Sequence, residues 1–280
     1  MTSFTFSGSL ADRSVNRVGF GAMQLPGPGV LGPPRDRDQA LAVLRRAVGL
    51  GVDHIDTAQF YGPDVANELI REALHPYPDN LLLVSKVGSR RDAGGAWHPA
   101  QTPAELRSAV DDNLRSLDVD RLGAVNLRRM LEHDLATDQV VPLEDQLAEM
   151  VALRDEGKIA GIGISTAPLA EVEMAIATAG VVCVQNAFSL LDQSDAATLA
   201  ACHAAGVAYV PYFPLGSAFP HLPKVTDDPT VQAAATRRGV TPAQVGLAWL
   251  LAHNPSILLI PGTSSVAHLE QNVAVGDLEL

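Results

Sequence analysis

The amino-acid sequence predicts an α/β fold, a (β/α)8 barrel of the TIM type that follows an N-terminal β-hairpin and forms one domain over residues 1–280. Three observations lead to this prediction. Eight short apolar runs alternate with amphipathic helical stretches, the connections between them are short, and no linker or shift in composition divides the chain. A chain of 280 residues that is 47% apolar suits one large core.

The strands are expected where apolar residues run continuously, because the strands of a closed parallel sheet are buried on both faces. Ahead of them, alternating residues over 3–7, then Gly8 and a second stretch over 14–18, are typical of a β-hairpin. The barrel strands are expected at residues 17–21, 54–56, 81–86, 122–127, 159–165, 182–186, 208–211 and 257–261.

Helices are expected between these strands. Residues 38–50 carry apolar side chains at helical spacing and stop at Gly51. Residues 102–105 (Thr-Pro-Ala-Glu) form a capping box with proline at the first helical position, and residues 241–244 (Thr-Pro-Ala-Gln) repeat this pattern. A doubly wound sheet is the alternative fold, but residues 19–24 lack the third glycine of the dinucleotide fingerprint and no helix begins there.

Composition excludes several classes of function. The net charge of −12 argues against binding to a nucleic-acid backbone, which needs a basic face. No apolar run reaches the length of a membrane helix and no signal peptide is visible, so we expect a cytoplasmic protein without a membrane partner. Cys183 and Cys202 lie in apolar stretches and are expected as buried free thiols. The dispersed histidines predict no metal site.

Polar residues follow the expected strands at their carboxyl ends, where barrel enzymes carry their active sites. Asp56 and Tyr61 follow the second strand, Lys86 ends the third and Arg128 follows the fourth. An ammonium group beside a phenol favours the phenolate. We therefore predict that Lys86, oriented by Asp56, lowers the pKa of Tyr61. Tyr61 would then donate a proton to a carbonyl oxygen as a hydride reaches the carbon.

Several segments, in order over nearly the whole chain, resemble the aldo-keto reductase family. They are residues 56–62 (Asp-Thr-Ala-Gln-Phe-Tyr-Gly), Lys86, and residues 161–165, 184–186, 212–216 and 260–263. The resemblance implies a barrel, NADPH bound in an extended form without a Rossmann domain, and a catalytic Asp–Tyr–Lys–His tetrad. Asp56, Tyr61 and Lys86 match its first three members.

The fourth member does not match, because the sequence places Arg128 where the family has histidine. Arg128 would hydrogen-bond the developing oxyanion, and Asn126, on the same strand face, is the alternative. Residues 21–25, 32–36, 125–128 and 260–269 resemble the bacterial subgroup that includes pyridoxal reductases. This resemblance makes the reduction of pyridoxal to pyridoxine the leading expectation.

The resemblance also implies a cofactor site. Residues 262–265 offer hydroxyl groups where many relatives carry Lys or Arg, so NADH stays open beside NADPH, since a 2′-phosphate prefers fixed cations. The implied cofactor-binding residues are Gly21, Ala22, Met23, Asp56, Ser165, Thr166, Gln185, Tyr212, Leu215, Gly216, Ser217, Ile260, Gly262, Thr263, Ser264, Ser265, His268, Gln271 and Asn272, and the substrate-facing residues are Phe60, Trp97 and Phe219.

Two other functions stay open. Lys86, if desolvated, would serve as the nucleophile of a Schiff-base aldolase, although Asp56 favours the protonated amine. The missing histidine is also compatible with a non-enzymatic redox sensor that binds NADPH. The expected partner is a small-molecule carbonyl substrate, and the expected assembly is a monomer or homodimer.

Overall fold

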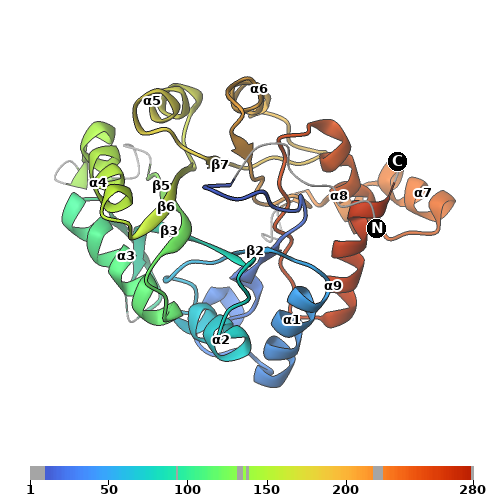
Figure 1. The fold of residues 1–280 in the computed structure, drawn as a ribbon. Helices are drawn as coiled ribbons and strands as arrows, with labels where there is room; N and C mark the ends of the chain where they lie inside the picture. Colours follow the sequence, from blue (N-terminus) through green and yellow to red (C-terminus); the bar gives the residue numbers. More distant parts are fainter. Residues whose placement is uncertain (1–9, 93, 131–134, 137–138, 217–222, 279–280) are drawn as a thin grey trace.

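The computed structural model describes residues 10–92, 94–130, 135–136, 139–216 and 223–278. Within them, parallel strands pair in the order β1-β2-β3-β5-β6-β7-β8, and β4 pairs antiparallel with β3. Figure 1 shows the strands enclosed by a ring of helices. The strands are β1 (Phe20–Gly21), β2 (His54–Asp56), β3 (Leu82–Arg91), β4 (Trp97–Ala100), β5 (Leu122–Arg128), β6 (Ile159–Ser165), β7 (Cys183–Gln185) and β8 (Ala208–Tyr209).

The sheet closes through the segment 257–261. Tyr209 bridges Ile257 and Val18 bridges Leu259, both in parallel, so this segment joins the two ends of the sheet. The closed parallel barrel confirms the predicted fold class. The segment predicted as the eighth barrel strand contributes only these single bridges and is no continuous strand.

Five predicted strands have different bounds in the structure, and the first and third differ most. The first is reduced to Phe20–Gly21, and the third extends five residues beyond its predicted end at Lys86 to Arg91, because its second half pairs with β4 rather than with the barrel alone. In the predicted N-terminal hairpin, residues 3–7 lie outside the described residues. Close to them, Leu10 and Arg13 form an antiparallel bridge.

The helices begin where the capping residues predict. Thr102 and Thr241 each form a complete capping box, and Asp36 caps the first helix by accepting from the backbone amide of Gln39 at 2.9 Å. The helices are α1 (Arg37–Gly49), α2 (Val65–Leu74), α3 (Pro103–Leu117), α4 (Leu143–Asp155), α5 (Leu169–Ala179), α6 (Ala196–Ala205), α7 (Pro229–Arg238), α8 (Pro242–His253) and α9 (Val266–Val273).

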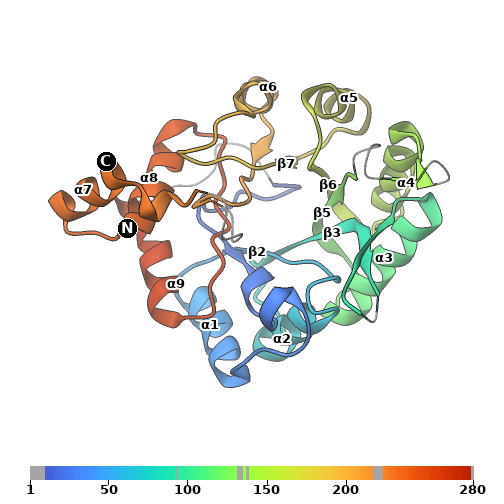
Figure 2. The same cartoon turned by 180° about the vertical axis from the view of Figure 1, so that it is seen from behind.

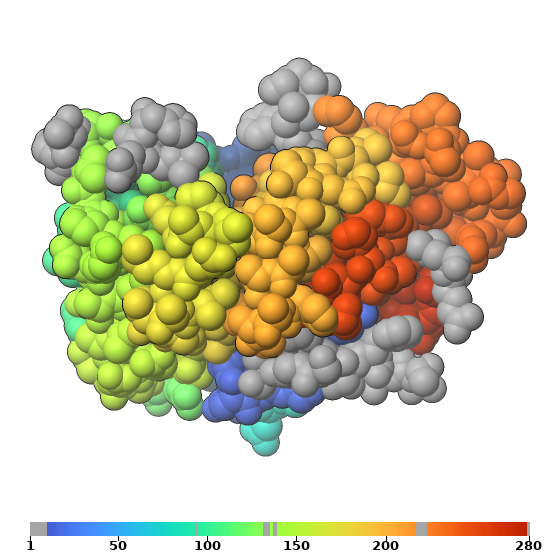
Figure 3. Space-filling view, turned by 90° about the horizontal axis from the view of Figure 1, so that it is seen from above, coloured from blue at the N-terminus to red at the C-terminus, as the bar shows by residue number. Residues whose placement is uncertain are grey.

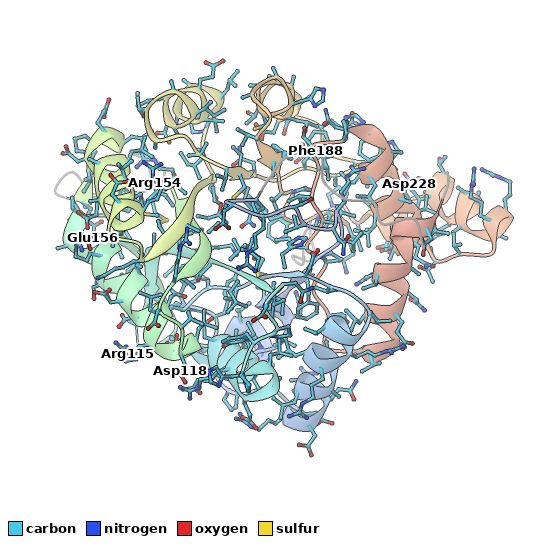
Figure 4. All side chains as sticks on the ribbon, in the orientation of Figure 1. Arg115, Asp118, Arg154, Glu156, Phe188 and Asp228 are labelled. Atoms are coloured by element: carbon cyan, nitrogen blue, oxygen red, sulfur yellow. The ribbon has the colours of Figure 1, made fainter. Side chains whose placement is uncertain are left out.

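The helices form the outer wall of the barrel. Figure 2 shows the ring from behind, with α7 outside it next to α8, and Figure 3 shows α4, α5 and α6 packed side by side as a continuous surface. In Figure 4, Arg115, Asp118 and Glu156 lie along the outer edge of α3 and α4. Glu156 pairs there with Arg107 at 2.6 Å. Exposed pairs of this kind contribute only about 0–1 kcal/mol, so the stability of the fold comes mainly from its core.

Candidate active site

The side chains that point into the barrel change from apolar to polar toward the carboxyl ends of the strands. Leu82, Val84 and Lys86 share one face of β3, because side chains two residues apart lie on the same side of a strand. The register aligns Lys86 with Asn126, and one layer higher it aligns Arg128 with Ser165. The lower layers hold the apolar cluster of Leu10, Val15, Leu82, Val84, Ala124, Cys183, Ala208, Val210 and Leu258.

Asp56 and Lys86 form a buried ion pair at the top of these layers, each side chain only 6% exposed. The Lys86 ammonium donates to Oδ1 of Asp56 and, at 3.1 Å, to the carbonyl oxygen of Thr57. The second carboxylate oxygen of Asp56 accepts from Nε2 of Gln185 at 3.0 Å. Burial lowers the pKa of Lys86, but Asp56 and Tyr61 together raise that pKa above its ordinary value. Lys86 is therefore a stable cation.

Tyr61 lies beside this pair, with its ring centroid 5.1 Å from Nζ of Lys86 and its side chain buried. Burial raises the pKa of the phenol, while the charges of Lys86 and Arg128 lower it and that of Asp56 raises it. The resulting pKa lies above the ordinary value of 10.0. The prediction of a lowered pKa is wrong in sign, because removal from water outweighs the two cations. Tyr61 keeps its proton at neutral pH, as a proton donor must.

A buried hydrogen-bond network behind β2 and β3 holds both strand ends. Asn67 of α2 accepts from the hydroxyl of Thr57 at 2.8 Å and donates to Oδ1 of Asn113 at 3.0 Å. The hydroxyl of Ser85 donates to the same oxygen of Asn113. Thr57 and Ser85 each adjoin one member of the ion pair, so this network fixes the positions of both.

Arg128 faces the same cavity as Tyr61. Its guanidinium donates to the hydroxyl of Ser89 at 2.6 Å and to the sulfur of Met130 at 3.1 Å, and it lies 5.4 Å from the ring centroid of Trp97. Burial lowers the pKa of the guanidinium. Its contacts among the described residues, Ser89, Met130 and Trp97, are all neutral.

Asn126, the alternative to Arg128, lies one layer deeper and is 1% exposed. Its side-chain oxygen accepts from the thiol of Cys183 at 3.4 Å, and a Cβ on Gly163 would lie 2.2 Å from that oxygen. Asn126 does not line the cavity. Arg128, and not Asn126, thus lines the same cavity as Tyr61.

The cavity at the strand ends has a volume of about 970 Å³. It brings together eleven residues that the sequence analysis placed in the site: Met23, Phe60, Tyr61, Lys86, Trp97, Arg128, Ser165, Thr166, Gln185, Tyr212 and Ser264. The remaining lining consists of residues 24–30, 34–36, 39–40 and Phe213, none of which was predicted. Most of these lie in the connection between β1 and α1, which is rich in proline and glycine.

The other predicted cofactor-binding residues that the structure describes do not line the cavity. Gly21 and Gly262 lie in close contact, since a Cβ on Gly21 would be 2.5 Å from the carbonyl oxygen of Ile260 and one on Gly262 would be 2.6 Å from that of Gly21. Ser265 caps α9 by accepting from the amide of His268 at 3.4 Å. The residues outside the lining are Gly21, Ala22, Asp56, Leu215, Gly216, Ile260, Gly262, Thr263, Ser265, His268, Gln271 and Asn272, and Ser217 lies outside the described residues.

The predicted substrate residues Phe60 and Trp97 lie in the wall of the cavity. The Phe60 ring packs edge to face against Tyr61 at 5.4 Å and against Trp97 at 5.2 Å. Trp97 lies on β4, where it pairs with Arg91. Phe219 lies outside the described residues.

Arg91 does not line the cavity but supports its wall, and the sequence analysis missed it. Its guanidinium lies 4.6 Å from the centroid of the Trp97 ring, and the two residues pair across the β3–β4 hairpin. It donates to the carbonyl oxygen of Gly95 at 2.9 Å and to that of Gly29 at 3.1 Å. Arg91 thereby ties the connection over residues 24–30 to the hairpin, and no local pattern in the sequence indicates this contact.

Other potential sites are few. In the part of the chain that the structure describes, no three His, Cys, Asp or Glu side chains come together as a metal ion would require. Cys183 and Cys202 are free and buried, as predicted, and burial raises the pKa of each thiol to about 12. None of the described helices combines the length and the apolar character that a membrane crossing requires.

Residues 17–280 match the model of the aldo/keto reductase family. The chain belongs to this family. It is 49% identical to pyridoxine 4-dehydrogenase of Escherichia coli K12 over 282 residues, which cover 100% of this chain and 95% of that relative. It is 36% identical to an uncharacterized oxidoreductase of Schizosaccharomyces pombe, over 97% of this chain and 85% of the relative. The predictions of an aldo-keto reductase and of an oxidoreductase are confirmed.

Solved structures of the family share the fold. An aldo/keto reductase from Klebsiella pneumoniae in complex with NADP and acetate has a TM-score of 0.80 at 25% identity, covering 100% of this chain and 92% of that one. A structure of an aldo-keto reductase from the same organism with NADPH has a TM-score of 0.81, with the same identity and coverage. The glycerol dehydrogenase of Gluconobacter oxydans, at 19% identity and a TM-score of 0.81, shows that the fold persists at much lower similarity.

Proposed function

We propose that the protein catalyses the NADPH-dependent reduction of an aldehyde or ketone to an alcohol, with pyridoxal, reduced to pyridoxine, as the leading substrate. The observation that carries this proposal is the meeting of Tyr61, the ion pair of Lys86 with Asp56, and Arg128 around one cavity. Pyridoxal is supported by the 49% identity to a pyridoxine 4-dehydrogenase along the whole chain.

NADPH is the proposed cofactor, supported by the NADP and NADPH complexes of the Klebsiella relatives. The residues of the cavity fit it. The volume of 970 Å³ is near the upper end of the roughly 300–1,000 Å³ that ligand pockets span. Gln185 and Ser165 line it beside Tyr212, and because Nε2 of Gln185 donates to Asp56, its Oε1 remains to accept from a carboxamide. When bound, the cofactor supplies a hydride to the carbonyl carbon.

The protein itself supplies the proton that the carbonyl oxygen takes up. As the hydride's two electrons form the new C–H bond, the π electrons of the carbonyl move to oxygen, which takes the phenolic proton of Tyr61. Lys86 and Arg128 stabilise the phenolate that forms, and Asp56 keeps Lys86 charged. Solvent returns a proton to Tyr61, so one carbonyl, one NADPH and one proton give one alcohol and one NADP⁺.

The Schiff-base aldolase is disfavoured by the same geometry. An aldolase lysine must be neutral to attack a carbonyl, whereas Asp56 and Tyr61 raise the pKa of Lys86. The redox sensor differs from the reductase only in turnover, and the acid and its two cations around one cavity favour the reductase.

An aldehyde panel that includes pyridoxal, assayed with NADPH and with NADH, tests the proposal. We expect pyridoxal-dependent oxidation of NADPH, and Tyr61→Phe should lower kcat by at least about 100-fold while the Kd for NADPH changes less than about twofold. Tyr77→Phe is the matched control, because the Tyr77 hydroxyl donates to Leu117 away from the cavity. Tight NADPH binding without turnover supports the sensor, and a borohydride-trapped adduct on Lys86 supports the aldolase.

Size-exclusion chromatography of the same preparation separates the expected monomer from a homodimer.

A further inference from the structure

We propose that Arg128 recognises an anionic oxygen next to the reacting carbonyl, so that the preferred substrates are aromatic aldehydes with an ionised hydroxyl ortho to the formyl group. This inference rests on the proposed reductase function and narrows its substrate class. Pyridoxal, whose 3-hydroxyl adjoins its 4-formyl group, belongs to this class.

The first observation is the charge of Arg128. Among the described residues its guanidinium contacts Ser89, Met130 and the ring of Trp97, all of them neutral. Lys86, the other cation beside the reacting group, is neutralised by its ion pair. No carboxylate of the described residues forms an ion pair with Arg128, and a half-buried cation without a counter-ion is unfavourable, so an anionic group on the ligand would offset that cost.

The second observation is the shape of the wall between the acid and this cation. Tyr61 packs edge to face against Phe60, Phe60 against Trp97, and the guanidinium of Arg128 lies 5.4 Å from the Trp97 ring. The proton donor and the cation are thus joined by a continuous aromatic surface. A flat aromatic ring bearing the carbonyl suits such a surface, since aromatic groups favour stacked and edge-to-face contacts.

The chemistry explains why the anionic oxygen should be ortho. A guanidinium presents parallel N–H donors that match two adjacent oxygens. An ortho oxide and the carbonyl oxygen form such a pair. An ionised hydroxyl also donates electrons into the ring and makes the carbonyl carbon less electrophilic, and binding to Arg128 withdraws part of that charge. Arg128 would therefore both select the substrate and restore its reactivity toward hydride.

Two isomeric aldehydes test this directly. In 2-hydroxybenzaldehyde and 4-hydroxybenzaldehyde the hydroxyl donates electrons to the carbonyl through the same ring, but only the first places it within reach of a shared guanidinium. We expect the wild type to prefer the 2-hydroxy isomer by about 10- to 100-fold in kcat/KM, a factor that corresponds to about 1.4–2.7 kcal/mol. In Arg128→Met the preference for the 2-hydroxy isomer should fall to within about twofold. Arg128→Lys keeps the charge but not the paired N–H donors of the guanidinium, and it should retain part of the preference.

Arg91→Gln is the matched control. Arg91 also contacts the Trp97 ring but does not line the cavity, so this variant should keep the ratio between the isomers even if both rates change. As a second readout on the wild type, titration of 2-hydroxybenzaldehyde with protein should increase the phenolate absorption band, and Arg128→Met should not increase it.

The outcomes separate this inference from the proposed function. Equal kcat/KM for the two isomers in the wild type, an unchanged preference in Arg128→Met, or no growth of the phenolate band would overturn the role of Arg128 and leave the reductase standing. The absence of any NADPH-dependent reduction of aldehydes would overturn the proposed function, and this inference with it.

Discussion

The substitution Asp56→Asn removes the counter-ion of Lys86 with almost no change in shape. In the wild type the Asp56 carboxylate accepts from Lys86 through one oxygen and from Gln185, at 3.0 Å, through the other. Asparagine offers a single acceptor oxygen, so one of these donors must face an NH2 group. Breaking a buried pair by removing one partner costs about 3–5 kcal/mol, and we expect the free energy of unfolding to fall by about this amount at pH 7.

The loss should depend on pH because Lys86 titrates. In the wild type the pKa of Lys86 lies above its ordinary value of 10.5, so the stability it contributes is present below that pH and disappears only as pH rises through the raised pKa. Without Asp56, burial dominates and the pKa of Lys86 falls below that of the unfolded chain. The unfolded state then binds more protons, so the destabilisation is largest at low pH and shrinks as pH approaches 10.5.

Urea unfolding monitored by tryptophan fluorescence at pH 7 and at pH 9.5 measures both effects. The double variant Asp56→Asn with Lys86→Met should recover most of the loss, because a methionine needs no counter-ion. Asp12→Asn, an exposed carboxylate far from the cavity, serves as the control. A loss below about 1 kcal/mol in Asp56→Asn, or a double variant no more stable than the single one, would refute the view that this pair is a buried ion pair.

Three further predictions concern the site and its support. Because burial raises the pKa of Tyr61, kcat/KM for an aldehyde without an ionisable group should stay level up to about pH 10 and decline only above it as the phenol loses its proton, and a decline centred near pH 8 would contradict this. Gly21→Ala places a Cβ 2.5 Å from the backbone oxygen of Ile260, so the affinity for NADPH, measured by fluorescence, should weaken by about tenfold or more. Gly49→Ala is the control, because a Cβ there has no atom within 4 Å, and it should leave the affinity unchanged. Asn67→Leu removes the acceptor of the Thr57 hydroxyl and one of the two donors to Oδ1 of Asn113, and it should lower the free energy of unfolding by about 1–3 kcal/mol in urea, while an effect below about 0.5 kcal/mol would show that the network is dispensable.

The sequence predicts a strand or helix correctly where the residues that specify it are close together in the chain. The strands expected at residues 54–56 and 159–165 coincide with β2 and β6, and both capping boxes begin helices, because these patterns depend on neighbours in the chain. The strand β4 was not predictable in the same way. Its sequence, Trp-His-Pro-Ala, is neither apolar nor alternating, and it is a strand because it pairs with the polar second half of β3.

The site shows the same division. The polar residues at the strand ends were found because every barrel strand directs its carboxyl end to one face of the molecule. The connection between β1 and α1 lines the cavity, and Arg91 contacts it from a segment about 60 residues away, a contact that leaves no mark on either segment alone. The close approach of Gly21 and Gly262 has the same origin.

The pKa of Tyr61 is the most instructive difference, because the sequence identifies the neighbouring charges but not how little water surrounds them. At an effective dielectric constant of about 20, an ammonium and a phenolate about 5 Å apart attract each other by about 3 kcal/mol. That attraction exists only once the phenol has lost its proton. Lys86 and Arg128 therefore contribute little while Tyr61 holds its proton and most as the carbonyl oxygen takes it. Their role is to stabilise the charge that develops in the transition state, which requires no acidic tyrosine in the resting enzyme.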